Sequence, residues 1–364
     1  MRLPLRPELA GLEPYGAPQL DVPVLLNVNE NPYPPPPAVV EEIARAVREA
    51  AGGLNRYPDR DFAALRADLA DYLDKESGVR LDPDRIWAAN GSNEVMLHLL
   101  QAFGGPGRTA LSFDPTYSMY PEYARDTATE WVTGRREDDF GLDPAKAAAL
   151  VAQVAPSVVL LASPNNPTGT AVPLSTVEAI LDAAREVPGG CVVVVDEAYA
   201  EFRRAGTPSA LDLLDAHPHL AVSRTMSKAF ALAGGRVGYL AAARPIVDAL
   251  HVVRLPYHLS AVTQAVARAA LAHSAELMAE VATLRDERDA LVAWLRERGY
   301  RVADSDANFV LFGVFDDRHA VWQGLLDRGV LIREVGPAGW LRVSVGTPEE
   351  TAAFRAALAE VDEP

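Results

Sequence analysis

Short apolar runs alternate with helical stretches between residues 108 and 243, and this alternation constrains the fold more than any other feature of the sequence. The runs have the length of strands, and stretches such as 175–187 between them carry apolar residues at helical spacing. Strands that alternate with helices form largely parallel sheets covered by helices on both faces. The sequence therefore predicts an α/β fold, with strands in RTALSF, SVVLLAS, CVVVVDEAY, HLAVSRT and VGYLAAA.

The pattern changes near Pro256, where long helices replace the alternation. The elements expected after this point are helices over 260–272 and 276–298, strands over 307–314 and 341–346 separated by a helix, and a last helix that runs to 361. They predict a smaller α+β domain. The consecutive prolines of NPYPPPP (31–37) exclude a helix or central strand and mark a linker. The predicted organisation is an N-terminal arm (1–35), a large domain (36–256) and a small C-terminal domain (257–364).

The charge balance bears on possible partners. The chain has 34 Lys and Arg against 50 Asp and Glu, a formal net charge of -16, so most of its surface repels nucleic acid and anionic membranes. An anionic ligand must then be bound by a few local arginines and backbone amides. The sequence has no signal-peptide pattern, no membrane-spanning stretch and no metal-ligand spacing, and a cytoplasmic protein is expected. Its one cysteine, Cys191, is interpreted as a small buried apolar residue.

A lysine at the end of one predicted strand has hydroxyl residues and an arginine near it in the sequence. Lys228 belongs to TMSKAFALAGGRVG, with Thr225 and Ser227 beside it and Arg236 eight residues further on. A strand-end lysine is usually only a solvated charge. Hydroxyls and an arginine, however, suit a phosphate monoester, and a lysine beside them can form a Schiff base with an aldehyde. A ligand with both groups is pyridoxal 5'-phosphate (PLP).

Two further strand ends carry polar residues that suit the ring of the same cofactor. Asp196 closes the run VVVV, where it is either a carboxylate in a turn or the partner of a protonated pyridine nitrogen. Tyr199 follows in DEAY, and Asn166 lies in SPNNPTG, which by itself is a strong turn signal. Both side chains can hydrogen-bond the ring hydroxyl O3'.

The motif NGSNE and the segment after it offer a phosphate site and a stacking residue. A glycine turn opens a helix here, and the free amides at a helix N-terminus bind anions. Ser92 and Asn93 can equally be read as ordinary helix caps. Tyr117 of DPTYSMY can stack on a planar ring, although a tyrosine is more often a packing residue.

The ordered set NGSNE, DPTYSMY, SPNNPTG, DEAY, SKAF and GGRVG resembles the fold-type I aminotransferases over nearly the whole chain. The resemblance implies a large PLP-binding domain with a mostly parallel sheet flanked by helices, and a smaller α+β domain. It implies Lys228 as the Schiff-base lysine, Asp196 on the pyridine nitrogen and Tyr117 on the ring face. It further implies O3' contacts from Asn166 and Tyr199, and a phosphate site made of Ser92, Asn93, Thr225, Ser227 and Arg236.

The segments LEPYG, LNVNENPY, NRYPD, VLIREV and LRVSVGT resemble a subgroup that exchanges amino groups between histidinol phosphate and 2-oxoglutarate. By similarity, Tyr15, Arg333 and Arg342 face these anionic substrates, although each arginine can equally form a surface ion pair. Tyr57 of NRYPD matches a residue that reaches the phosphate in the neighbouring subunit, which implies a homodimer with shared active sites.

Three other functions stay open at this point. An aromatic amino-acid aminotransferase and a decarboxylase of a phosphorylated amino acid would share the cofactor motifs. A PLP-binding regulator would need a DNA-binding domain, and roughly 35 residues before the first expected helix leave no room for one.

Overall fold

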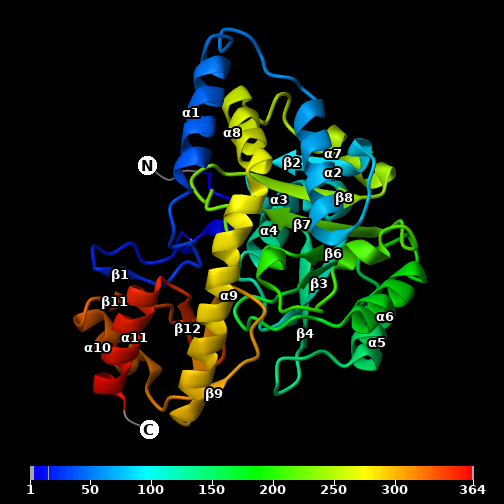
Figure 1. The fold of residues 1–364 in the computed structure, drawn as a ribbon. Coiled ribbons are helices and arrows are strands. Elements are labelled where there is room, and N and C mark those ends of the chain that lie inside the picture. The colour runs from blue at the N-terminus through cyan, green and yellow to red at the C-terminus, as the bar shows by residue number, and fades with distance from the viewer. Residues whose placement is uncertain (1–3, 15, 363–364) are drawn as a thin grey trace.

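The computed structural model describes residues 4–14 and 16–362, and its centre is a seven-stranded sheet with the strand order β2-β8-β7-β6-β5-β3-β4. Strands β3 to β7 pair in parallel, whereas β8 is antiparallel to both of its neighbours. The prediction of a mostly parallel sheet in an α/β fold is therefore confirmed (Figure 1). The strands are β2 (Ile86–Ala89), β3 (Thr109–Asp114), β4 (Glu130–Arg135), β5 (Val158–Ala162), β6 (Val192–Asp196), β7 (Leu220–Thr225) and β8 (Gly238–Ala242).

Helices flank this sheet because each presents an apolar stripe to it. Strands β5 and β6 are buried along their whole length, as expected when both faces of a sheet are covered. Helix α5 packs on α6, and α3 packs on α4 and α7. The bounds are α3 (Ser92–Phe103), α4 (Tyr120–Asp126), α5 (Pro144–Val154), α6 (Leu174–Arg185) and α7 (Arg244–Val253).

A smaller unit has its own apolar cluster and a three-stranded antiparallel sheet with the order β12-β10-β9. Its elements are β9 (Arg301–Val302), β10 (Phe309–Gly313), α10 (Arg318–Asp327), β11 (Val330–Leu331), β12 (Leu341–Ser344) and α11 (Pro348–Val361). Strand β1 (Val24–Leu25) pairs in parallel with β11, so part of the N-terminal segment belongs to this unit. In Figure 1, β1 lies beside β11 at the edge of the red and orange C-terminal elements.

Three helices pack together beside the larger unit, and a fourth runs from it to the smaller unit. Helix α8 (Ala261–Ala272) packs against α1 (Pro37–Ala51) and α2 (Ala63–Ser77). Helix α9 (Ser274–Glu297) has Leu277 in the larger apolar cluster and Leu295 in the smaller one. The N-terminal part of α9 therefore packs in the larger cluster and its C-terminal part in the smaller one. The domain boundary after residue 256 stays a prediction.

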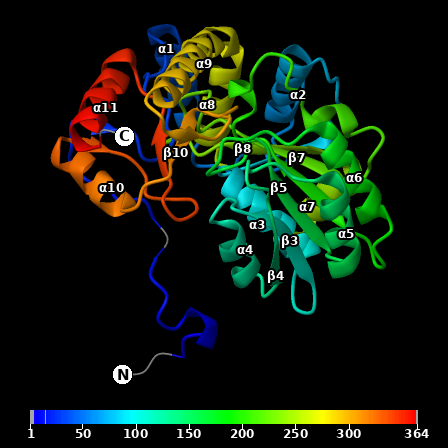
Figure 2. The same ribbon diagram turned by 90° about the horizontal axis from the view of Figure 1, so that it is seen from below.

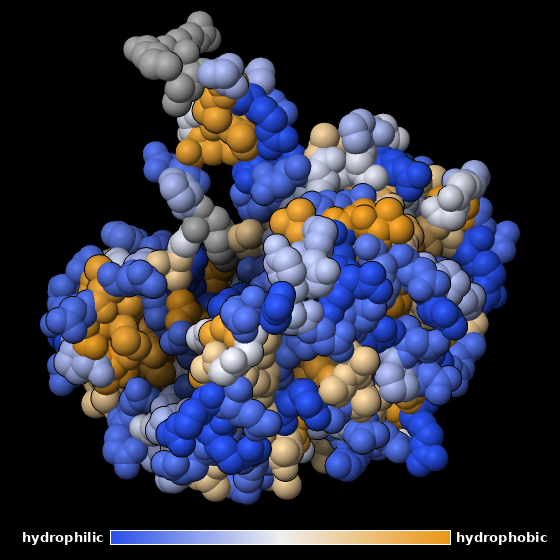
Figure 3. Space-filling model, turned by 90° about the horizontal axis from the view of Figure 1, so that it is seen from above, coloured by the Kyte–Doolittle hydropathy of each residue, from blue (hydrophilic) through white to orange (hydrophobic). Residues whose placement is uncertain are grey.

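The first described residues, 4–14, stand away from the body of the molecule (Figure 2). Leu5 and Leu12 are exposed there, and apolar side chains are visible on this segment in Figure 3. None of the helices within residues 4–14 and 16–362 is long and apolar enough to cross a lipid bilayer.

Candidate active site

A cavity lies at the carboxyl ends of the strands of the large sheet. It is lined by the last residues of these strands and by the loops that follow them. The smaller unit closes its other side with residues from the segment after β11, from β12 and from the N-terminal segment. The structure brings twelve of the predicted site residues together in its lining: Ser92, Asn93, Tyr117, Asn166, Asp196, Tyr199, Thr225, Ser227, Lys228, Arg236, Arg333 and Arg342.

Lys228 extends into this cavity from the loop after β7. Its Nζ donates a hydrogen bond of 3.1 Å to the backbone oxygen of Val28 in the N-terminal segment. Burial, and next the positive charge of Arg342, lower the pKa of the Lys228 amine to about 8. A substantial fraction of the amine is therefore neutral near physiological pH, which is the form that attacks an aldehyde.

Asp196 is the last residue of β6, and its two carboxylate oxygens differ in their hydrogen bonding. Tyr120 at the start of α4 donates a hydrogen bond of 3.0 Å to Oδ2, and among the described residues nothing hydrogen-bonds the buried Oδ1. Burial raises the pKa of Asp196 to about 6, and the hydrogen bonds from Tyr120 and from the backbone of Ala198 oppose that rise. An oxygen left without a donor in a buried site fits the protonated ring nitrogen of PLP.

A cradle of donors lies where β7, β8 and the start of α3 meet. Arg236 Nη1 donates to Ser227 Oγ at 3.2 Å, and Thr225 Oγ1 donates to the same oxygen at 3.0 Å. Gly91 precedes α3 with φ +85°, and a Cβ there would lie 2.5 Å from Arg236 Nη2. The absence of that Cβ lets the guanidinium approach the free amides at the start of α3. These donors fit a phosphate group.

The side of the cavity formed by the smaller unit is positively charged. Arg342 on β12 donates from Nη1 to Asn166 Oδ1 at 2.6 Å and from Nη2 to the backbone oxygen of Asn27 at 2.8 Å. The backbones of Arg333 and Arg342 hydrogen-bond each other in an antiparallel bridge, which places both side chains on this wall. Two adjacent guanidinium groups fit an anionic substrate.

One predicted residue, Tyr57, is not brought into the cavity. Tyr57 is 80% exposed outside it, and its ring stacks on that of Tyr257 with centroids 4.4 Å apart. Tyr15 lies outside the described residues, so its predicted contact with substrate stays a prediction.

The structure also shows site residues that the sequence did not reveal. Tyr120 contacts Asp196, and Asn27, Val28 and Asn29 line the cavity. Tyr120 comes three residues after Tyr117, a spacing that brings both rings to one side of a helix start, and this was a usable signal. Asn27 and Asn29 lie in LNVNENPY, which entered only as a resemblance. Their place in the cavity was not predicted, because their partners Arg342 and Tyr199 are more than a hundred residues away in sequence.

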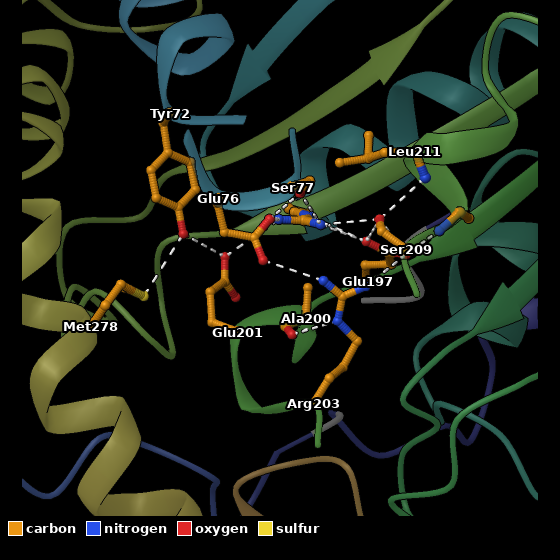
Figure 4. Close-up of polar contacts among 12 residues, drawn as sticks. Tyr72, Glu76, Ser77, Glu197, Ala200, Glu201, Arg203, Ser209, Leu211 and Met278 are labelled. Carbon is orange, nitrogen blue, oxygen red and sulfur yellow. Dashed lines mark hydrogen bonds and ion pairs between the residues drawn. The ribbon is translucent and has the colours of Figure 1, made fainter. Parts of the chain in front are cut away.

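A buried ionic network includes the residues next in sequence to Asp196 and Thr225 (Figure 4). Arg224, the residue before Thr225, donates to Glu197 Oε2 at 2.9 Å and to Glu76 Oε2 at 2.6 Å. Arg203 contacts Glu76 Oε1 at 3.2 Å. Because Glu197 follows Asp196, this network ties the ends of β6 and β7 to each other and to α2.

Comparison with known proteins agrees with this geometry. Residues 22–358 match the family described as aminotransferase class I and II. The histidinol-phosphate aminotransferase of Thermobifida fusca is 66% identical over 98% of this chain and 95% of its own length. That of Bifidobacterium longum is 60% identical over 99% and 96%.

A solved structure gives the same result for the fold. The histidinol-phosphate aminotransferase of Sinorhizobium meliloti in complex with pyridoxal-5'-phosphate superposes with a TM-score of 0.80 at 26% identity, covering 93% of this chain and 91% of that one. The chain belongs to the class I and II aminotransferases, and within that family to the histidinol-phosphate aminotransferases.

Proposed function

We propose that this enzyme uses PLP to exchange the amino group of histidinol phosphate with 2-oxoglutarate, which yields imidazole-acetol phosphate and glutamate. The observation that carries the proposal is the Lys228 amine, which shares one cavity with a cradle of hydrogen-bond donors and a wall with two arginines. The names of the relatives at 60–66% identity support the same substrate.

The residues around the amine have defined parts in this proposal. PLP, when bound, supplies an electron sink for the carbanion formed at the substrate Cα. Asp196 would face the ring nitrogen with its unsatisfied oxygen, Tyr117 would pack on the ring face, and Asn166 and Tyr199 would bind the ring hydroxyl. The phosphate would be held by Ser92, Asn93, Thr225, Ser227 and Arg236.

Lys228 has two tasks. Its Nζ would hold the cofactor covalently. Once free, the neutral amine would accept on Nζ the proton that leaves the substrate Cα. Its lowered pKa favours the neutral, proton-accepting form. The backbone oxygen of Val28 directs the amine in the absence of a ligand.

Arg333 and Arg342 bind the anionic ends of the two substrates, with Tyr15 proposed beside them. Histidinol phosphate has a phosphate and glutamate has carboxylates, and both approach a protein whose formal net charge is -16. Local guanidinium groups on the cavity wall offset that unfavourable field over a short range.

The enzyme is proposed to act in the cytoplasm as a homodimer in which Tyr57 reaches the phosphate of the partner's active site. This arrangement is supported by exposed large apolar residues, which a second copy could cover. They are Tyr57 itself, Leu54, Val252, Leu255 and Tyr257. The projecting N-terminal arm, with Leu5 and Leu12 exposed, offers a further surface for the second copy (Figure 2).

Single-turnover reactions of the PLP-loaded enzyme test the substrate. Histidinol phosphate should convert the cofactor at least about a hundredfold faster than unphosphorylated histidinol, because the arginines then bind the phosphate. Phenylalanine is the second comparison. If phenylalanine reacts as fast as histidinol phosphate, the enzyme is an aromatic amino-acid aminotransferase and the proposed substrate is wrong.

A further inference from the structure

Asn29 lies between the two units of the molecule and is almost fully buried, with 2% of its surface exposed. Its backbone has φ +56°, a left-handed conformation that asparagine and glycine adopt more readily than other residues. It follows the short strand β1 and lines the cavity. A buried residue with an unusual backbone at this position is a candidate for a positioning role.

Hydrogen bonds fix Asn29 to the smaller unit. Its backbone N–H donates to Ser344 Oγ at 2.9 Å, and Ser344 Oγ donates to Asn29 Oδ1 at 3.0 Å. Asn308 Nδ2 donates to the backbone oxygen of Asn29 at 3.0 Å. Ser344 ends β12 and Asn308 precedes β10. These hydrogen bonds therefore fix the position of Asn29 relative to the three-stranded sheet.

One hydrogen bond connects Asn29 to the larger unit. Its Nδ2 donates to the hydroxyl oxygen of Tyr199 at 3.0 Å, in the loop after β6. Ser344 determines which end of the amide faces Tyr199: the opposite orientation would put two donors on Ser344 Oγ and take away the acceptor of its proton. The Tyr199 oxygen is therefore held as an acceptor on this side.

The ring of Tyr199 contacts the smaller unit as well. Phe309 of β10 packs edge-on against it, with centroids 5.0 Å apart and planes at 82°. Arg342 lies over Phe309 at 5.1 Å from the ring centroid. Both the hydroxyl and the ring of Tyr199 thus contact residues that are fixed to the smaller unit or belong to it.

We propose that Asn29 is a positioning residue that couples the smaller unit to the Tyr199 hydroxyl and orients that hydroxyl toward the cofactor. The inference rests on the proposed function only in that Tyr199 binds the ring hydroxyl of PLP. Because the Tyr199 oxygen accepts from Asn29, its O–H is not donated to Asn29. A hydrogen bond from that O–H to the ring hydroxyl oxygen of PLP would stabilise the ionised form of the ring hydroxyl.

Two substitutions distinguish the role of the Asn29 side-chain amide from that of its backbone conformation. Asn29→Gly keeps the left-handed conformation and the bond from its N–H to Ser344 but removes the donor to Tyr199. Asn29→Asp keeps the size and replaces that donor by an acceptor, so Tyr199 must donate to Asp and is turned away from the cofactor. If Asn29→Gly does not fold, Asn29→Asp still tests the proposal.

The experiment is a double-mutant cycle with Tyr199→Phe on the PLP-loaded protein without substrate. The readouts are the PLP dissociation constant and the pH midpoint of the visible absorbance of the bound cofactor. Each Asn29 variant should raise that midpoint by about 0.5 to 1 pH unit, as expected for the loss of one hydrogen bond. In the Tyr199→Phe background Asn29→Gly should change it by less than about 0.2 unit, because its target is gone. Asn29→Asp should shift it less there than beside an intact Tyr199, since only the through-space effect of the added carboxylate remains.

Equal shifts in both backgrounds, or no shift in either, would overturn the coupling. These readouts need no amino-acid substrate, so failure of the coupling is distinguishable from failure of the proposed substrate. If histidinol phosphate is not turned over and the cycle still shows coupling, only the proposed substrate is wrong.

Discussion

The hydroxyl of Tyr120 donates a 3.0 Å hydrogen bond to Asp196 Oδ2, and both side chains are buried. This bond opposes the effect of burial, which raises the pKa of Asp196 to about 6. Tyr120 therefore helps to keep the carboxylate ionised where the ring nitrogen of PLP is proposed to bind.

Tyr120→Phe should raise the pKa of Asp196 further and weaken PLP binding. A hydrogen bond to a charged group contributes about 1.5 to 3 kcal/mol, so the dissociation constant should increase about 10- to 100-fold. The loss should be larger at pH 6 than at pH 8, since the carboxyl becomes protonated as the pH falls through its pKa. Fluorescence titration of the apoenzyme with PLP measures it, with Tyr123→Phe on the same helix as the control. Equal effects of the two variants would contradict a specific role of Tyr120.

Lys228 should react with amine-directed reagents at lower pH than an ordinary lysine. The chain has three lysines, Lys75, Lys146 and Lys228, so peptide mass spectrometry resolves each one. Modification of Lys228 in the apoenzyme should be half-maximal near pH 8, whereas Glu137 raises the pKa of Lys146 above its usual value. Lys228→Ala should abolish covalent attachment of PLP after borohydride reduction, and attachment that survives would rule out this lysine.

Mixed dimers test whether Tyr57 acts in the partner's active site. Neither Tyr57→Phe nor Lys228→Ala homodimers have an intact site. A mixed dimer has one site with both residues intact if Tyr57 crosses the interface, because the two lesions then fall in the other site. Differently tagged subunits allow its isolation, and its activity should be about half that of the unsubstituted dimer. Activity no higher than that of the Tyr57→Phe and Lys228→Ala homodimers would show that the sites are not shared.

Arg342→Ala should reduce kcat/KM for histidinol phosphate and for glutamate. Charge-assisted hydrogen bonds contribute about 1.5 to 3 kcal/mol each, so losing a bidentate contact should reduce kcat/KM about 10²- to 10⁴-fold. Arg342→Lys should recover part of this loss, because it keeps the charge but not the two-pronged geometry. Arg333→Ala is the comparison: if only one half-reaction slows, the two arginines serve different substrates.

Arg224→Met should destabilise the fold. Among the described residues it leaves Glu197 and Glu76 with Arg203 as their ion-pair partner. Removal of one partner from a buried ion pair lowers the free energy of unfolding by about 3 to 5 kcal/mol. The loss should be smaller at pH 5 than at pH 8, because unpaired buried carboxylates take up protons as the pH falls. Urea unfolding measures it, and Arg45→Met on the surface of α1 should have almost no effect. Equal stability of the two variants would contradict the role of the network.

The sequence predicted those parts of the site that depend on local pattern. Asp196, Asn166 and Lys228 follow strands whose apolar runs are visible in the sequence, and parallel strands bring their carboxyl ends to one edge. Strand β1 was not predicted, because two residues give no periodicity and its partner β11 is some three hundred residues away. The contact between Tyr120 and Asp196 depends in the same way on tertiary packing.

The position of Tyr57 shows a different limit. The motif NRYPD predicted a role at an active site, yet within one chain the residue lies outside the cavity and stacks on Tyr257. A sequence motif reports a function without saying which subunit performs it, so only an assembled dimer can test this residue.

The pairing of β1 with β11, and of Asn29 with Ser344, has a consequence for synthesis of the protein in the cell. The segment made first joins strands made last, although the large sheet between them is complete after residue 242. During translation that sheet can form while the cavity still lacks the wall that contains Arg342. A ribosome stalled before residue 342 would therefore present a folded sheet with Lys228 already in its loop but without the arginine needed to select an anionic substrate.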